Sequence, residues 1–163
     1  MSTDIFLKID DIKGESKADG HADEIEVENW SWSAVQTGTS SKGGGSGAGR
    51  VQMTELVITK YMDKSSPVLY KMCCLGTHIQ QVLLTARKAG GSQMPYLKVT
   101  LKDAMITNVS TNGATGGLVP LETIQIAFKK VAFAYTAQTN TGEPDAEVIG
   151  GYDLELEKEW DGN

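Results

Sequence analysis

The two histidines are the side chains of this sequence best suited to nucleophilic or metal chemistry. Such a site needs a histidine that converges with Cys, Asp or Glu. His21 lies near Asp23 and Glu24, but their spacing matches no metal motif, and a histidine in a polar loop is usually solvated or caps a turn. His78 follows a predicted helix, where a cation near the C-terminal end is mildly favourable. Neither histidine predicts a catalytic or metal site.

The two cysteines are adjacent, at Cys73 and Cys74, within the same predicted helix. A disulfide between neighbours needs unusual backbone geometry, so we expect no framework of cross-links and folding in a reducing compartment. One thiol is expected to be buried and the other partly exposed, and neither has an activating histidine in a thiol-enzyme pattern. Two structural thiols are the simpler interpretation.

Three pairs of carboxylates could act as general acid and base: Asp10 with Asp11, Asp23 with Glu24, and Glu155 with Glu157. Each pair lies on a predicted solvated edge or on the wet face of a predicted strand. A catalytic pair needs an environment that separates the roles of its two members, and water does not supply one. The sequence therefore predicts no catalytic residue, no metal, no cofactor and no enzyme.

Residues 38–50 form a glycine-rich stretch, GTSSKGGGSGAGR, and free backbone amides in such a stretch can surround a phosphate. A P-loop, however, needs Gly-Lys-Ser/Thr at the start of a helix, whereas here Arg50 and a predicted strand follow the glycines. Gly43, Gly45 and Ala48 meet the dinucleotide pattern in form, but strands flank them on both sides. A nucleotide-dependent enzyme is thus the weaker interpretation. The stronger one is a flexible loop that becomes ordered against a neighbouring molecule.

The length and the charge of the chain limit the classes of protein to which it can belong. A chain of 163 residues buries about 70% of the surface that it exposes when unfolded, so we predict a single domain over residues 1–163. The 21 acidic and 15 basic residues give a charge of -6, which opposes binding to nucleic acid. Asp4 and Lys8 interrupt any apolar signal core, and no apolar run of 18 residues follows. We expect a soluble protein, made in the cytoplasm, with no membrane insertion and no cleaved signal peptide.

Alternation with a period of two dominates the chain and predicts a mainly β protein. Strands are expected over residues 4–10, 24–37, 51–62, 79–88, 96–109, 121–135 and 152–160. One helix is expected over residues 67–75, because Ser66 and Pro67 form a start signal and Gly76 a stop signal. The polar residues 139–145 are expected to form a loop.

The second predicted strand changes phase part-way along. Ile25 and Val27 lie on one face, but the next large apolar residues, Trp30 and Trp32, have the opposite parity. One extra residue near positions 28–29 would bring all four to the same side. The two tryptophans would then help to fill the interior of the sheet.

A similar slip occurs at residues 129–130 inside the predicted strand 121–135. Two slipped strands suggest a bent, barrel-like sheet, since bulges curve and close sheets. Between the tryptophans, Ser31 points away from the core, where a functional surface could lie.

Several stretches of the sequence follow one another in an order and spacing that are together specific. They are DIFLKIDDIKGES, HADEIEVENWSW, a glycine-rich loop ending in GRV, LVITKYMDKSSPVL, and ARKAGG followed by YLKVTLKDAMITNVS. Through these stretches the sequence resembles the Hcp family over about its whole length.

The resemblance implies a small bent β-barrel of two packed antiparallel sheets with one flanking α-helix, assembling into a hexameric ring. In this family the rings stack into the inner tube of the phage-tail-like type VI secretion system, inside a sheath and below a spike. They also hold effector proteins in the lumen before export. The resemblance therefore implies a structural tube subunit that is cytoplasmic before firing and is then secreted.

Two sites follow as hypotheses from this resemblance. Ser31 would face the lumen and contact the effector. Subunit or ring-stacking contacts would come from Lys42, Gly43, Gly44, Gly45, Ser46, Gly47 and Arg50. The alternative is a monomeric β-sandwich module that binds carbohydrate or another ligand, and solvent-exposed Trp30 and Trp32 would favour it.

Overall fold

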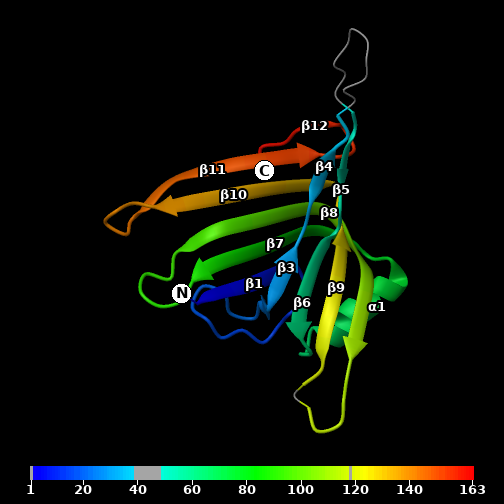
Figure 1. The fold of residues 1–163 in the computed structure, drawn as a ribbon. Coiled ribbons are helices and arrows are strands. Elements are labelled where there is room, and N and C mark those ends of the chain that lie inside the picture. The colour runs from blue at the N-terminus through cyan, green and yellow to red at the C-terminus, as the bar shows by residue number, and fades with distance from the viewer. Residues whose placement is uncertain (1, 39–48, 118) are drawn as a thin grey trace.

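The computed structural model describes residues 2–38, 49–117 and 119–163. Within them the chain forms twelve β-strands and one α-helix, which confirms the prediction of a mainly β protein (Figure 1). The strands are β1 Thr3–Ile9, β2 Ile25–Glu26, β3 Asn29–Ser31, β4 Ala34–Gln36, β5 Val51–Met53, β6 Leu56–Tyr61, β7 His78–Lys88, β8 Pro95–Asn112, β9 Leu121–Ala127, β10 Lys130–Gln138, β11 Pro144–Asp153 and β12 Lys158–Glu159. The helix α1, Ser66–Leu75, lies between β6 and β7 in the chain.

Ten of the strands form one branched antiparallel sheet. The first branch, layer 1, has the order β12-β11-β10-β8-β7-β1-β2, and the second, layer 2, leaves β8 as β9-β6-β3. The first half of β8 pairs with β7 and β10 and its second half with β9, so this strand belongs to both layers. In Figure 1 the strands of layer 1 run from side to side and those of layer 2 run from top to bottom. The remaining strands, β4 and β5, form a separate two-stranded ribbon.

No closed barrel is detected among the described strands, so this part of the predicted fold is not confirmed. Between β2 and β3 the chain leaves one layer for the other. The backbone N–H of Val27 donates to the carbonyl of Ile5 in β1 at 3.0 Å, and that of Glu28 to the carbonyl of Thr59 in β6 at 2.8 Å. The predicted change of phase at residues 28–29 is present here, and its cause is the exchange of partner strand.

Layer 1 turns into layer 2 at Asp103, in the middle of β8. Asp103 has a left-handed φ of 51°, and its neighbours Leu101 and Ala104 are both buried although their positions differ in parity. Along the same edge of β8, β9 and β10 follow one another with an interruption between them. The predicted strand 121–135 is therefore two strands, and the predicted slip at residues 129–130 lies at the bend.

The apolar core fills the space between the two layers. Its fully buried members include Leu7, Ile25, Leu56, Ile58, Val82, Leu84, Leu101, Ile124 and Ile126. Trp30 and Trp32 are half-buried and pack against this core, and the ring centroid of Trp32 lies 4.6 Å from that of Phe133. The two tryptophans are thus core residues, as expected, and they lie at the margin of the core.

The helix begins and ends close to its predicted limits. Pro67 lies in its first turn, and Gly76 ends it in the left-handed conformation, with φ 60°. The Gly76 N–H donates to the carbonyl of Cys73 at 3.2 Å. The N-cap is Ser65, one residue earlier than the sequence suggests, and its N–H donates to Asp63 at 2.9 Å.

The predicted strand over residues 152–160 is not continuous, because residues 152–153 end β11, residues 158–159 form β12 and a turn lies between them. Strand β11 ends at Asp153, whose buried carboxylate accepts the N–H groups of Glu155 and Leu156, both at 2.9 Å, and this turns the chain. Residues 144–151 form a strand that was not predicted, because most of their side chains are exposed and show no alternation. Pairing with β10 alone makes them a strand. Of the predicted loop, residues 139–143 are confirmed.

A buried ion pair joins α1 to layer 2. The side chain of Lys60 in β6 is fully buried, with Nζ 2.8 Å from Oε2 of Glu122 in β9 and 3.0 Å from Oδ1 of Asp63. Ser66, in the first turn of the helix, accepts from Lys60 at 3.0 Å and donates to Glu122 at 2.6 Å. Buried charges need such partners, because removing one leaves the other unpaired away from water.

We expect Lys60→Met to lower the free energy of unfolding by about 3 kcal/mol, because Glu122 and Asp63 lose their buried cation. Urea denaturation of the dilute protein measures this loss. Lys64→Met is the control, since Lys64 is exposed and close in sequence. Equal losses in the two variants would contradict the role of the buried pair.

Asp153 makes folding depend on pH. The N–H of Leu156 is the main cause of the lowered pKa of the Asp153 carboxyl. The N–H of Glu155 and the charge of Lys130 lower this pKa further, and burial opposes them. A lowered folded-state pKa stabilises the fold above the unfolded-state value of about 3.9, and this contribution is lost as the pH falls through the folded-state pKa. Unfolding measured at pH 7 and near pH 2 should therefore show Asp153→Asn less stable than wild type at pH 7, with the difference shrinking in acid. A constant difference would refute this.

Candidate functional site

The outward surface of layer 2 carries uncharged side chains in its two central cross-strand rows, and we call it the polar face. The rows cross β3, β6, β9 and β8 and consist of Asn29, Thr59, Thr123 and Ser110, and of Ser31, Val57, Gln125 and Asn108. All eight residues are exposed or half-buried. Their sequence neighbours Ile58 and Ile124 point into the core, because side chains alternate along a strand. These two rows thus present seven uncharged hydrogen-bonding side chains and one apolar side chain, that of Val57.

The structure places Ser31 on the polar face. It is exposed and lies opposite Val57, while Trp30 and Trp32 turn towards the core. The prediction that Ser31 points away from the core is therefore confirmed, and its contact with an effector stays a prediction.

The predicted assembly segment is described only in part. Lys42, Gly43, Gly44, Gly45, Ser46 and Gly47 lie outside the described residues. Arg50 is described, and its guanidinium lies 2.5 Å from Oε1 of Glu157, with both side chains largely exposed. An exposed pair of this kind contributes little to stability, so Arg50 stays accessible to another molecule.

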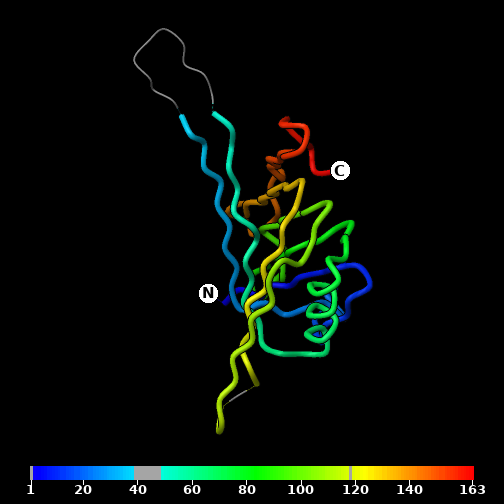
Figure 2. The backbone as a smooth tube through the Cα atoms, turned by 90° about the vertical axis from the view of Figure 1, so that its right-hand side faces the viewer, coloured from blue at the N-terminus to red at the C-terminus, as the bar shows by residue number. Residues whose placement is uncertain are grey.

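Strands β4 and β5 form a ribbon, called the arm below, that projects beyond the end of layer 2 (Figures 1 and 2). Val35, in the middle of β4, is 55% exposed. At the base of the arm the N–H of Ser33 donates to Oγ1 of Thr54 at 2.8 Å, and the N–H of Thr54 donates to the carbonyl of Ser33 at 2.9 Å. A two-stranded ribbon has little stability alone, so an arm of this shape is suited to contact with another surface.

Layer 2 has two unpaired edges among the described strands. At one end β3 pairs with β6 alone. At the other end the ladder between β7 and β8 stops at Met105, which leaves residues 106–112 of β8 paired with β9 on one side only. Such edges expose backbone N–H and C=O groups that a strand of another molecule can bind.

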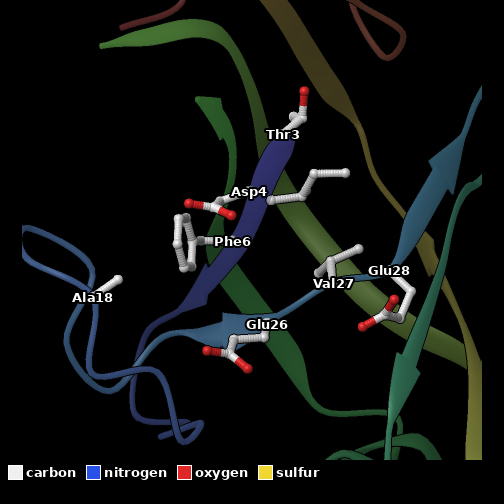
Figure 3. A pocket seen from close by; sticks show the side chains of 8 residues that line it. Thr3, Asp4, Phe6, Ala18, Glu26, Val27 and Glu28 are labelled. Atoms are coloured by element: carbon white, nitrogen blue, oxygen red, sulfur yellow. The ribbon is translucent and has the colours of Figure 1, made fainter. Parts of the chain in front are cut away.

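A hollow of about 330 Å³ lies beside β1 and β2 and contains three carboxylates, from Asp4, Glu26 and Glu28 (Figure 3). Asp4 is 3.6 Å from Nε of Arg87. No group of three His, Cys, Asp or Glu residues within the described ranges could hold a metal ion. The hollow therefore makes the neighbourhood of the β3 edge acidic and has no catalytic arrangement of the usual kinds.

His21 is packed, which corrects the expectation of a solvated or turn-capping side chain. Its ring stacks on that of Phe6 with centroids 4.3 Å apart, and its Nδ1 lies 2.8 Å from Oε2 of Glu24. The guanidinium of Arg87 lies 5.0 Å from the centroid of the same Phe6 ring. His21 thus fastens the loop between β1 and β2 to layer 1.

The other candidate groups lie at the surface or at the margin of the core. Cys73 is half-buried and Cys74 is exposed, so the expected difference between the two thiols is present but neither is buried. His78 is exposed at the start of β7, with Nε2 3.0 Å from Oδ1 of Asp103. In the described part of the chain, no helix has the length and apolar character to cross a membrane.

Comparison with known proteins decides the family. A family model described as "Type VI secretion system effector, Hcp" matches residues 6–135. The chain belongs to the Hcp family. Protein hcp1 of Pseudomonas aeruginosa is 50% identical to it over 146 residues, which cover 89% of this chain and 90% of that protein.

Solved structures of Hcp-related proteins share the fold. A structure described as that of a type six secretion system protein has a TM-score of 0.92 at 28% identity, covering 98% of this chain and 100% of that one. Hcp1 of Salmonella typhimurium has a TM-score of 0.81 at 38% identity, with the same coverage. Hcp proteins are structural proteins of type VI secretion and are themselves secreted, which agrees with the prediction that this chain is not an enzyme.

Proposed function

We propose that this Hcp protein is the subunit of a type VI secretion tube, that six copies close into a ring, and that the polar face lines the channel and holds effector proteins. The observation that carries the proposal is layer 2, which has two different unpaired edges among the described strands and two uncharged central rows on its polar face. The number of copies rests on the family resemblance.

The two edges of layer 2 suit a ring. The four strands alternate in direction, so β3 and the second half of β8 run in opposite directions. The β3 edge of one copy would therefore extend the sheet of the next copy as a further antiparallel strand beside β8. Because the contact joins two different edges, it is head-to-tail, and a contact of this kind forms a ring when the rotation between copies closes.

The covering of layer 2 decides which face can line the channel. Layer 1 and α1 lie on one side of layer 2 and bury that face (Figure 2). Only the polar face remains open in a ring built from layer 2. Neutral hydroxyl and amide groups can form hydrogen bonds with protein cargo of either charge, which suits a channel for effectors.

The arm and the glycine-rich segment complete the proposal. The arm projects beyond layer 2, in a direction that leads out of the plane of one ring and towards another. Residues 42–47 and Arg50 would contribute to contacts between subunits or stacked rings. The stacked tube, inside its sheath and below its spike, would start in the cytoplasm and be secreted with its cargo.

Light scattering and native mass spectrometry of the purified chain test the ring. We expect a species of about six times the chain mass of 17.5 kDa, which dissociates on dilution. A strict monomer at every concentration would contradict the proposal and would favour the monomeric binding module.

Ser31→Gln tests the channel. The longer side chain would project from the polar face into the path of cargo, so we expect normal rings that retain and export less effector. Ser92→Gln, in the exposed turn between β7 and β8, is the matched control. Export of every effector at the wild-type level by Ser31→Gln would show that the polar face does not hold cargo.

A further inference from the structure

The arm leaves layer 2 through an irregular joint. In the arm Met53 lies opposite Ala34, and in layer 2 Val57 lies opposite Ser31. Three residues on one strand, 54–56, therefore face two on the other. An extra residue of this kind bends and twists a strand pair. It also adds backbone freedom, so the bulge alone does not set one angle between the arm and layer 2.

A second bulge lies in β8, on the far side of β9 from the joint. Strand β9 pairs with Ile106 and Asn108, which leaves Thr107 as the extra residue. The Thr107 hydroxyl reaches across β9, donates to Oε2 of Glu55 at 2.5 Å and lies 3.3 Å from the carbonyl oxygen of Gln125. Since Glu55 belongs to the joint, the two irregular segments are bonded to each other.

We propose that the bond between Thr107 and Glu55 is a latch that fixes the angle of the arm and thereby positions the arm for contact with a neighbouring copy. A hydroxyl that donates to a carboxylate forms a short, charge-assisted bond, and its direction is defined by both partners. The bond ties Glu55, in the irregular joint, to β8, which is not part of the arm. Positioning for a neighbouring copy rests on the proposed function, whereas fixing the angle does not.

The position of the latch connects the two surfaces that a ring would use. Thr107 belongs to residues 106–112 of β8, which have a described partner strand on one side only, and Glu55 lies at the base of the arm. Thr107 is exposed and Glu55 half-buried, so neither is part of the core. Loss of the bond would therefore release the arm and leave the fold intact.

Amide hydrogen exchange of the dilute, monomeric chain tests the angle-fixing role. Thr107→Val removes the donor and keeps the shape, and Glu55→Gln removes the charge of the acceptor. In both variants we expect the amides of residues 34–36 and 51–54 to exchange about fivefold faster, with those of β6 and β9 unchanged. Thr123→Val is the matched control, because Thr123 is a half-buried threonine of the polar face away from the joint.

The double variant Glu55→Gln/Thr107→Val should exchange no faster than the faster single variant, because both changes break one bond. Wild-type exchange in the arm of both single variants, or additive effects in the double variant, would overturn the latch. Equally fast exchange in Thr123→Val would overturn its specificity.

Light scattering then tests the positioning role. If wild type forms rings, we expect both latch variants to need higher protein concentrations for assembly than Thr123→Val. Unchanged assembly with a released arm would overturn the positioning role and leave the tube function standing. A wild-type chain that never assembles would refute the tube function, and the exchange experiment would still decide the latch.

Discussion

Strand β8 is the element on which the rest of the structure depends, because its first half belongs to layer 1 and its second half to layer 2. Its bend at Asp103, with φ 51°, changes which side chains of the strand are buried and sets the two layers across one another. The second half of β8 then supplies the last residue of each row of the polar face, an edge without a described partner strand, and Thr107. The surfaces that we assign to assembly are thus consequences of one bent strand.

The helix and its buried charges make layer 2 one-sided. Lys60 and Glu122 lie in neighbouring strands, and Ser66 in the first turn of α1 bonds to both. Burial of an ion pair costs desolvation, so its value lies less in net stability than in where it holds the helix. With α1 held there, one face of layer 2 is closed and the polar face is the one left for other molecules.

We assign the proposed tube function of this Hcp protein to its surfaces. The side chains of His21 and Glu24 meet at 2.8 Å in the loop packed on Phe6, whereas the polar face carries hydroxyl and amide groups. A tube is built by repeating one contact many times, so small differences in the geometry of that contact are multiplied along the assembly. Rigid edges and a fixed arm angle are therefore the properties that a tube subunit needs.

Local signals along the chain are enough to specify several of the elements. Alternation specifies β1, β7 and β8, the Ser-Pro start and Gly76 specify α1, and the phase change at residues 28–29 places Ser31 away from the core. Which strands are neighbours is visible only in the folded chain, and so are the rows of the polar face, the partners of β11 and the bond between Glu55 and Thr107. Lys60 and Glu122 lie between these two cases. Each is in phase with the buried residues of its own strand, and this signal is present in the sequence. Nothing local, however, indicates that the two side chains meet. Backbone pairing joins residues far apart in the chain, and the energy that selects a partner belongs to neither strand alone.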